Sequence, residues 1–355
     1  MDIPKRMKAA VLYGPDDLRI EERDVPLPGP GEVLVKVRAC AICGTDPKIL
    51  SKGWPSQPPY GEYIPGHEYT GEVVAVGETV DEYKVGDRIA VETHKGCGRC
   101  VNCLRGMYTI CLNYGNKEKG HRHYGFTANG GYAEYVVNHI NVLHRLPDNV
   151  SFEEGTIATT GGTVLYGLET IGGLKGGETV VIMGPGAIGL MAVQFAKAFG
   201  AEKVILTGTR ESRLEVGRSL GADVICNVKK ENVVEKILDL TGGKGADVVI
   251  ECSGSMEAAE KTTDVVKRGG IILLLGIYKD RVRLDLNKVV LGNVAVYGVR
   301  GEGFRATGRV LSLLGQKKIT GKPLITHTFP LTEIKEAFKT FVERIGGAIK
   351  VVVIP

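Results

Sequence analysis

The sequence has 355 residues, a length that favours two domains over a single hydrophobic core. With 43% hydrophobic and 24% charged residues, its composition is that of an ordinary globular protein. The formal net charge of +4 is small, which argues against nucleic acid or a membrane surface as a partner.

Neither a secretory signal nor a membrane span is predicted. The amino-terminal residues MDIPKRMKAAV contain basic side chains, but no apolar run follows them. The uncharged stretch 179–196 just reaches spanning length, yet Gly184, Pro185 and Gly186 interrupt it, so we interpret it as strand, turn and helix. We therefore expect a cytoplasmic protein.

The first third of the chain is predicted to form β structure. Residues 31–39 alternate between apolar and polar side chains, and residues 69–76 and 88–91 are further apolar runs bounded by glycine and aspartate. This pattern is typical of a twisted antiparallel barrel. The apolar end of the chain, residues 348–355, needs a partner strand, so we expect the chain to return to the barrel after about Val299.

In the second half of the chain, short apolar runs are separated by helical segments such as residues 211–220 and 256–267. This alternation predicts a doubly wound parallel sheet, so the fold class is α/β with two domains. We place the barrel domain at residues 1–160 and 300–355 and the sheet domain at residues 161–299. The predicted parallel strands are TVVIM, KVILT, DVIC, DVVIEC, GGIILLLG and VAVYG.

Residues 184–189 match the pattern Gly-x-Gly-x-x-Gly between a predicted strand, residues 180–183, and a predicted helix that runs to Phe199. Glycines permit a tight turn and a close approach of the backbone to pyrophosphate, while the helix amino terminus supplies partial positive charge. A glycine-rich turn can be purely structural, but here the strand, the helix and the following βα units agree. We therefore predict a nicotinamide dinucleotide site. Its predicted contacts in this loop are Gly184, Gly186, Ala187, Ile188 and Gly189.

Coenzyme selectivity should be decided after the next strand, where NAD-specific folds place an acid that bonds the adenosine ribose. This chain has Gly208, Thr209 and Arg210 there, and a hydroxyl with a guanidinium can hold a 2′-phosphate that an acid would repel. Arg213 is a further candidate, and we predict NADP(H). The alternative is that Arg210 is solvated and NAD binds through backbone contacts. Other predicted coenzyme contacts are Ser253, Gly276 and Val299.

Four of the eight cysteines crowd into one short lobe, about residues 95–113. Without a secretory signal, such a cluster favours metal over disulfides. Four thiolates around one tetrahedral ion, with no position left open, are typical of structural zinc. An iron–sulfur cluster is disfavoured because the last spacing is long and Leu112, rather than proline, follows the last cysteine. The predicted ligands are Cys97, Cys100, Cys103 and Cys111.

A second candidate metal site lies upstream, at Cys43 and His67. A thiolate and an imidazole on separate turns can hold a zinc ion that keeps one position free for substrate. Taken alone, the two residues would more often be a buried thiol and a hydrogen-bonded histidine. The motifs in the rest of the sequence, described next, favour the metal site over this alternative.

Several motifs together resemble a known family. GHEYTGEVVAVGETVDEYKVGDRIAV, the four-cysteine lobe, GGYAEYVV and GPGAIGL occur in the order and at the separations of zinc-containing medium-chain dehydrogenases, which include alcohol, sorbitol, threonine and glucose dehydrogenases. The segment VETHKGCGRC is most similar to threonine dehydrogenases. The segment FEEG resembles polyol and secondary alcohol dehydrogenases. Gly208-Thr209-Arg210 resembles the Gly-Ser-Arg signature of NADP-dependent secondary alcohol dehydrogenases. The resemblance implies a GroES-like barrel, a Rossmann coenzyme domain, and a homodimer or homotetramer built by joining coenzyme sheets edge to edge. The apolar strand Val294–Val299 is compatible with such joining.

Residue by residue, the resemblance makes Cys43 and His67 ligands of a catalytic zinc, with Glu68 either a ligand or an adjacent exchangeable one. Thr45 would link the zinc-bound alcohol to a proton relay. Asp46 would orient His67.

Two residues depart from the family pattern. The remaining protein ligand of the family, an acid or a cysteine, aligns with Thr159, so the site would rest on Cys43, His67 and Glu68 or recruit Glu153 or Glu154 instead. The histidine that commonly passes the proton to solvent aligns with Lys48. An ammonium could relay a proton if its pKa were depressed, or bind an anionic substrate group.

The predicted reaction is hydride transfer between a secondary alcohol, polyol or sugar-like substrate and NADP(H), with zinc as Lewis acid. One alternative is an NAD-dependent enzyme similar to L-threonine 3-dehydrogenase. Another, suggested by Thr159, is a catalytically silent, zinc-stabilised NADPH-binding protein. The loop Lys117–His123 is interpreted as solvated, with an anion-binding role as the alternative. Trp54 would either line the substrate cleft or close the barrel.

Overall fold

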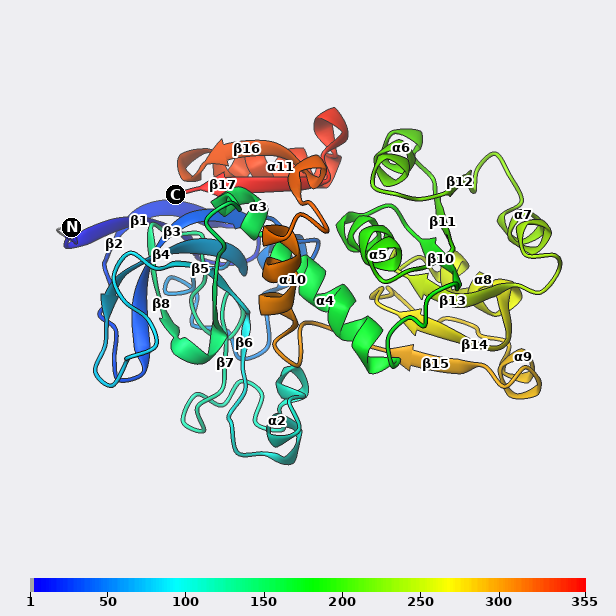
Figure 1. Ribbon diagram of the computed structural model, residues 1–355. Coiled ribbons are helices and arrows are strands. Elements are labelled where there is room, and N and C mark those ends of the chain that lie inside the picture. Colours follow the sequence, from blue (N-terminus) through cyan, green and yellow to red (C-terminus); the bar gives the residue numbers. More distant parts are fainter. Residues whose placement is uncertain (1–2) are drawn as a thin grey trace. The chain divides into compact units, whose positions relative to one another are not determined.

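The computed structural model describes residues 3–355. It divides them into two compact units (Figure 1). Unit 1 comprises the chain up to Gly162 and the stretch Glu302–Pro355, and unit 2 comprises Thr163–Gly301. The predicted boundaries lie within two residues of these. In Figure 1 unit 1 is blue through cyan to green and orange to red, and unit 2 runs from green through yellow to the light orange of β15.

Unit 1 is built on a β-sheet in the order β16-β17-β3-β4-β5-β9, with β8 paired to β3. Strand β17 pairs with β3 through Val352 opposite Ala41, which supplies the partner that its apolar sequence requires. The side chains of Leu34, Val35 and Ile89 are buried in the core of this unit. The strands of this sheet are β3 (Glu32–Ala41), β4 (Glu68–Val76), β5 (Arg88–Val91), β8 (Tyr135–His139), β9 (Leu143–Arg145), β16 (Ile325–Pro330) and β17 (Lys350–Ile354).

Two small antiparallel pairs and several helices complete unit 1. The four strands are β1 (Arg6–Leu12), β2 (Leu18–Asp24), β6 (His94–Lys95) and β7 (Arg122–His123). The α-helices are α1 (Asp46–Lys52), α2 (Val101–Leu104), α3 (Phe152–Gly155), α10 (Ala306–Gly315) and α11 (Ile334–Glu343), and α4 (Ile157–Thr170) runs from unit 1 into unit 2. The short 3₁₀ helices are η1 (Tyr108–Ile110), η2 (Ile140–Val142), η3 (Lys322–Leu324), η4 (Leu331–Glu333) and η5 (Ile345–Gly347).

Unit 2 is a parallel sheet in the order β12-β11-β10-β13-β14-β15. Numbered from its first strand, this is the order 3-2-1-4-5-6 of doubly wound dinucleotide folds, so the predicted fold class is confirmed. The strands are β10 (Thr179–Met183), β11 (Lys203–Gly208), β12 (Val224–Asn227), β13 (Ala246–Glu251), β14 (Val266–Leu274) and β15 (Ala295–Gly298). The helices are α5 (Ala187–Ala198), α6 (Glu211–Ser219), α7 (Val233–Leu240), α8 (Met256–Val265) and α9 (Leu286–Leu291).

One predicted boundary in unit 2 was wrong. The helical periodicity from Met256 extended to Lys267, but α8 ends at Val265 and β14 begins at Val266. Val266 pairs with Ala246 in β13, and a register shift follows in the ladder. Because Val266 and Lys267 belong to β14, they are not part of the helix. The stretch 179–196 is β10, a turn and most of α5. Within residues 3–355, no helix is long and apolar enough to cross a membrane.

Candidate active site

Cys43, His67 and Glu68 come together in unit 1, with one ligand atom from each residue lying within 4.8 Å of those of the others. The reason is strand pairing. Cys43 follows β3, and His67 and Glu68 stand at the start of the antiparallel neighbour β4. Because Ala41 pairs with Glu68, the end of one strand and the start of the other meet at the same edge of the sheet.

A fully buried carboxylate, Asp46, supports this cluster from behind. Its Oδ2 accepts hydrogen bonds from the Cys43 backbone N–H at 2.8 Å and from Tyr132 Oη at 2.9 Å. Its Oδ1 lies 3.2 Å from His67 Nδ1, close enough for an ion pair although neither atom is aligned for a hydrogen bond. Since Nδ1 faces Asp46, Nε2 is the nitrogen that remains for a metal, the arrangement expected of a metal-binding histidine.

The charge around His67 is strongly negative. Burial by itself lowers the pKa of the imidazole, but the Asp46 carboxylate and the Cys43 thiolate outweigh it and raise the pKa well above its usual value. A metal cation bound at Nε2 would be stabilised by the same two acidic groups, Asp46 and Cys43. The chemistry of the donor set, one thiolate, one imidazole and one carboxylate, is that of a zinc site.

Glu68 is paired inside the protein with a residue that the sequence reasoning missed, Lys350, the first residue of β17. The side chains are only 3% and 4% exposed. Lys350 Nζ binds Glu68 Oε2, and Thr160 Oγ1 donates to Glu68 Oε1 at 3.3 Å. Burial lowers the pKa of Lys350, but Glu68 and Cys43 more than compensate, and the pKa is raised. The signal was present in the sequence, because a single lysine stands inside the apolar run AIKVVVIP.

Aromatic rings lie against the imidazole of this cluster. The Phe126 ring centroid is 4.5 Å from that of His67, and Trp54 packs edge-on against Phe126 at 4.9 Å. Trp54 Nε1 donates to Tyr114 Oη at 2.8 Å, and that oxygen lies 2.7 Å from His123 Nδ1. Trp54 is therefore one ring removed from His67 of the candidate metal site.

The four-cysteine lobe forms the second cluster, again with all ligand atoms within 4.8 Å of one another. The Cys97–Cys103 and Cys100–Cys111 sulfur pairs are 3.9 Å apart, far beyond the disulfide length of about 2.05 Å. Four sulfurs about 2.3 Å from one tetrahedral ion would lie about 3.8 Å apart, so the spacing fits zinc. Asn113 Nδ2 donates to Cys97 Sγ at 3.2 Å. Desolvation raises the pKa of Cys97, but hydrogen bonds from Asn113 and the backbone lower it to about 6.

The glycine-rich loop of unit 2 has the geometry that a pyrophosphate site needs. Gly184 follows β10 with φ of +109°, a conformation that other residues rarely adopt. Gly186 is the residue before α5, and a Cβ on Gly189 would overlap the carbonyl oxygen of Gly184. A Cβ on Gly208 would overlap the ring of Pro185, so this glycine lets the end of β11 approach the loop.

The other predicted coenzyme residues lie at the same, carboxyl end of the parallel strands, where ligands of this fold bind. Thr209 and Arg210 follow β11 and are exposed, and Arg213 is half-buried in α6. The remaining three, after β13, β14 and β15 respectively, are Ser253, Gly276 and Val299.

Comparison with known proteins gives the family. An alcohol dehydrogenase GroES-like domain model matches residues 29–148, and a zinc-binding dehydrogenase model matches residues 187–315. L-threonine 3-dehydrogenase of Pyrococcus abyssi is 36% identical over 98% of this chain and 97% of its own. Sorbitol dehydrogenase of Bacillus subtilis is 31% identical over 99% of this chain and 98% of its own. The chain belongs to the zinc-containing medium-chain dehydrogenase/reductase family.

Solved structures agree with this assignment. A chain of Sinorhizobium meliloti, described as a zinc-binding dehydrogenase and crystallised bound to NADP, superposes with a TM-score of 0.91. It is 31% identical and the match covers 99% of this chain and 100% of that one. 2R,3R-butanediol dehydrogenase from Bacillus subtilis superposes with a TM-score of 0.88 at 29% identity, covering 98% and 99% of the two chains.

Thr159, which the resemblance aligns with the remaining protein ligand of the family, has a hydrogen bond to the backbone of β5. Thr159 Oγ1 lies 3.5 Å from the Val91 carbonyl oxygen, while its neighbour Thr160 reaches Glu68. Glu154 lies outside the cluster, and its Oε1 accepts from Thr320 Oγ1 at 3.0 Å and from the Gly321 N–H at 2.9 Å. Glu153 is likewise outside the cluster.

The two predicted proton-relay residues of the dehydrogenase lie differently. Thr45 Oγ1 is 3.8 Å from Cys43 Sγ, so its hydroxyl stands at the candidate metal site. Lys48 is exposed on α1. The loop Lys117–His123, predicted to be solvated, is exposed only in its first half. His121 and His123 are buried, and Arg122–His123 forms β7, which pairs with β6. Arg122 also donates to the Lys117 carbonyl at 2.8 Å.

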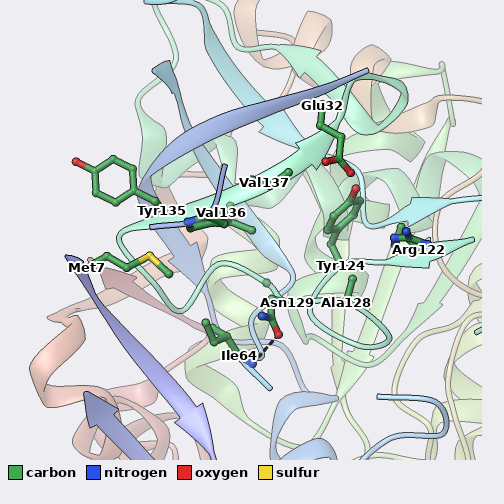
Figure 2. A pocket seen from close by; sticks show the side chains of 12 residues that line it. Met7, Glu32, Ile64, Arg122, Tyr124, Ala128, Asn129, Tyr135, Val136 and Val137 are labelled. Atoms are coloured by element: carbon green, nitrogen blue, oxygen red, sulfur yellow. Dashed lines mark hydrogen bonds between the residues drawn. The ribbon is translucent and has the colours of Figure 1, made fainter. Parts of the chain in front are cut away.

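A separate cavity of about 200 Å³ opens in unit 1 of the dehydrogenase (Figure 2). Met7, Ile64 and Val136 supply its apolar lining, while Glu32 and Arg122 supply charge. No member of either cysteine-containing cluster lines it. Two residues that line the cavity are hydrogen-bonded to each other: the Ile64 N–H donates to Asn129 Oδ1 at 3.1 Å, drawn as the dashed line in Figure 2.

Proposed function

We propose that this dehydrogenase transfers a hydride between a secondary alcohol, polyol or sugar-like substrate and NADP(H), at a zinc ion held by Cys43, His67 and Glu68. The observation that carries the proposal is the convergence of these three ligand atoms within 4.8 Å. When bound, zinc would supply Lewis acidity for the substrate oxygen. The four-cysteine lobe would hold a second, structural zinc.

The chain's own residues would orient the site and move the proton. Asp46 fixes the imidazole of His67 and the backbone of Cys43. The Thr45 hydroxyl, next to Cys43 Sγ, can accept the proton of a substrate hydroxyl and pass on its own. Phe126 and Trp54 exclude water beside the imidazole, which strengthens the electrostatic interactions there.

A metal count and a substrate screen test this function. Secondary alcohols, polyols, sugars and amino alcohols are each tested with NADP and NAD. We expect two zinc ions per chain and turnover with a secondary alcohol, a polyol or a sugar. Turnover confined to L-threonine with NAD would support the alternative that the 36% identity to the Pyrococcus enzyme favours. One zinc ion per chain and no turnover would support the catalytically silent binding protein.

NADP(H) is favoured by the residues after β11. Thr209 and Arg210 are exposed there, and the nearby acid, Glu211, is already engaged by Asn227 Nδ2 at 2.9 Å and by Lys230 Nζ at 3.0 Å. A phosphate at this position would meet a hydroxyl and a guanidinium rather than a free carboxylate.

Replacing Arg210 by alanine should weaken NADP binding about tenfold to a hundredfold and leave NAD binding nearly unchanged. The reason is the loss of charge-assisted hydrogen bonds, about 1.5–3 kcal/mol, to the 2′-phosphate. Fluorescence titration gives both dissociation constants. Arg218→Ala, on the helix α6 that follows Arg210 and paired with Glu215, is the matched control. An unchanged NADP constant in Arg210→Ala would refute the selectivity argument.

We also propose that the enzyme is a homodimer or homotetramer joined through β15. This strand is one of the two edge strands of the unit 2 sheet, and Val296 and Tyr297 on it are 38% and 37% exposed. An unpaired, partly apolar edge can add a strand from a second copy. A single-chain mass in sedimentation velocity would contradict this.

A further inference from the structure

Glu251 is the last residue of β13, a central strand of unit 2, and it is 0% exposed. Burying a carboxylate is costly unless its oxygens are bound by donors. Here every donor that the described structure places on the side chain is neutral. The sequence analysis gave this residue no role.

The two oxygens of Glu251 bind two different loops. Oε1 accepts from the Ser253 backbone N–H at 2.7 Å and from the Ser253 hydroxyl. Oε2 accepts from the Gly254 N–H at 3.2 Å and from Tyr278 Oη at 2.7 Å. Ser253 and Gly254 belong to the loop after β13, whereas Tyr278 belongs to the loop after β14. One buried carboxylate therefore ties the two loops together.

These loops pack closely against the carboxylate and against one another. A Cβ on Gly276 would overlap Glu251 Oε2, and a Cβ on Gly254 would come within 2.8 Å of the Ile277 carbonyl oxygen. The glycine-rich loop joins them, because a Cβ on Gly184 would lie 2.7 Å from Ser253 Cβ. Three loops at the carboxyl ends of β10, β13 and β14 thus share one contact region.

The position of these loops decides which half of a dinucleotide they serve. In the strand order of this sheet, the dinucleotide crosses the carboxyl ends at β10, with one nucleotide on each side. The selectivity residues after β11 belong to the adenosine side. The loops after β13 and β14 lie on the opposite side, where the nicotinamide nucleotide binds.

We propose that Glu251 is a positioning residue of the coenzyme site, which fixes Ser253 and Gly276 for the nicotinamide half of the dinucleotide. The inference rests on the proposed coenzyme function. A purely structural role, capping the end of β13, would stabilise the unit as a whole. A positioning role instead affects one half of the coenzyme selectively.

The test uses full-length Glu251→Gln protein and two ligands, NADPH and 2′,5′-ADP, which carries the adenosine half alone. The amide is almost the same size, but it replaces one acceptor oxygen with an NH₂ group that faces N–H or O–H donors. We expect NADPH to bind about tenfold more weakly and 2′,5′-ADP to bind within about twofold of wild type. If the wild type prefers the unphosphorylated coenzyme, NADH and AMP replace the two ligands.

Two further variants control the experiment. Asp247→Asn removes a carboxylate at the amino end of the same strand, where it binds Lys267 and the Thr179 N–H, and should leave both affinities unchanged. Tyr278→Phe removes only one donor from Glu251 and should weaken NADPH selectively but less, which keeps the inference testable if Glu251→Gln does not fold.

The outcomes separate the inference from the function on which it rests. Equal weakening of both ligands, or no weakening of either, would overturn the positioning role while the coenzyme function stands. Wild-type protein that binds neither coenzyme would overturn the proposed function and the inference with it.

Discussion

Replacing Cys43 by serine is expected to remove one of two zinc ions and to lower kcat/KM at least about a thousandfold. A serine hydroxyl is a poor zinc ligand at neutral pH, and within residues 3–355 the proposed site offers His67 and Glu68 as the other candidate ligands. The loss of Lewis acidity withdraws several kcal/mol from the transition state, and each 1.36 kcal/mol is a factor of ten. Zinc content by mass spectrometry and steady-state kinetics measure the two effects.

The matched control is Cys40→Ala. Cys40 lies three residues earlier at the end of β3, is fully buried, and is not a member of either cluster. This variant should keep two zinc ions and lose only packing energy. A Cys43→Ser enzyme with two zinc ions and full activity would remove the basis of the proposed mechanism.

Replacing Lys350 by methionine should have the largest effect on stability. In the metal-free protein it would leave Glu68 buried without its cation, a loss of about 3–5 kcal/mol in the free energy of unfolding. Zinc would then supply the missing positive charge. The variant should therefore gain more stability from added zinc than the wild type does, measured as the shift of the urea midpoint with and without the metal.

Two comparisons make this prediction specific. Lys339→Met, at an exposed position on α11, should change neither quantity. The double variant Lys350→Met/Glu68→Gln, which removes both charges of the pair, should recover part of the lost stability and lose the extra gain from zinc. A metal-free Lys350→Met protein as stable as the wild type would show that the pair contributes nothing.

The features that could be predicted from the sequence are mostly those whose residues lie close together in the chain. The parallel sheet followed from short apolar runs alternating with helical segments, and the lobe followed from cysteines close together in the chain. The glycine-rich turn is equally local, since the overlap that forbids a side chain at Gly189 comes from Gly184. In each case the residues that define the feature lie within a few turns of one another.

What the sequence did not reveal depends on pairing between distant strands. Glu68 and Lys350 are 282 residues apart and meet only because β17 joins β3, the neighbour of β4. Alignment by position identified Thr159 as the residue of interest, but successive residues of a helix point about 100° apart. Its neighbour Thr160 is the one that reaches Glu68.

The order of the chain has a consequence for biosynthesis. The ribosome makes β3 and β4 first, then all of unit 2, and only afterwards β17. Until that strand emerges, the nascent barrel holds the carboxylate of Glu68 without its ammonium partner, while the coenzyme sheet already has every strand it needs. Unit 2 can therefore fold cotranslationally, and the sheet of unit 1 beside the proposed metal site is completed only after unit 2 has been made.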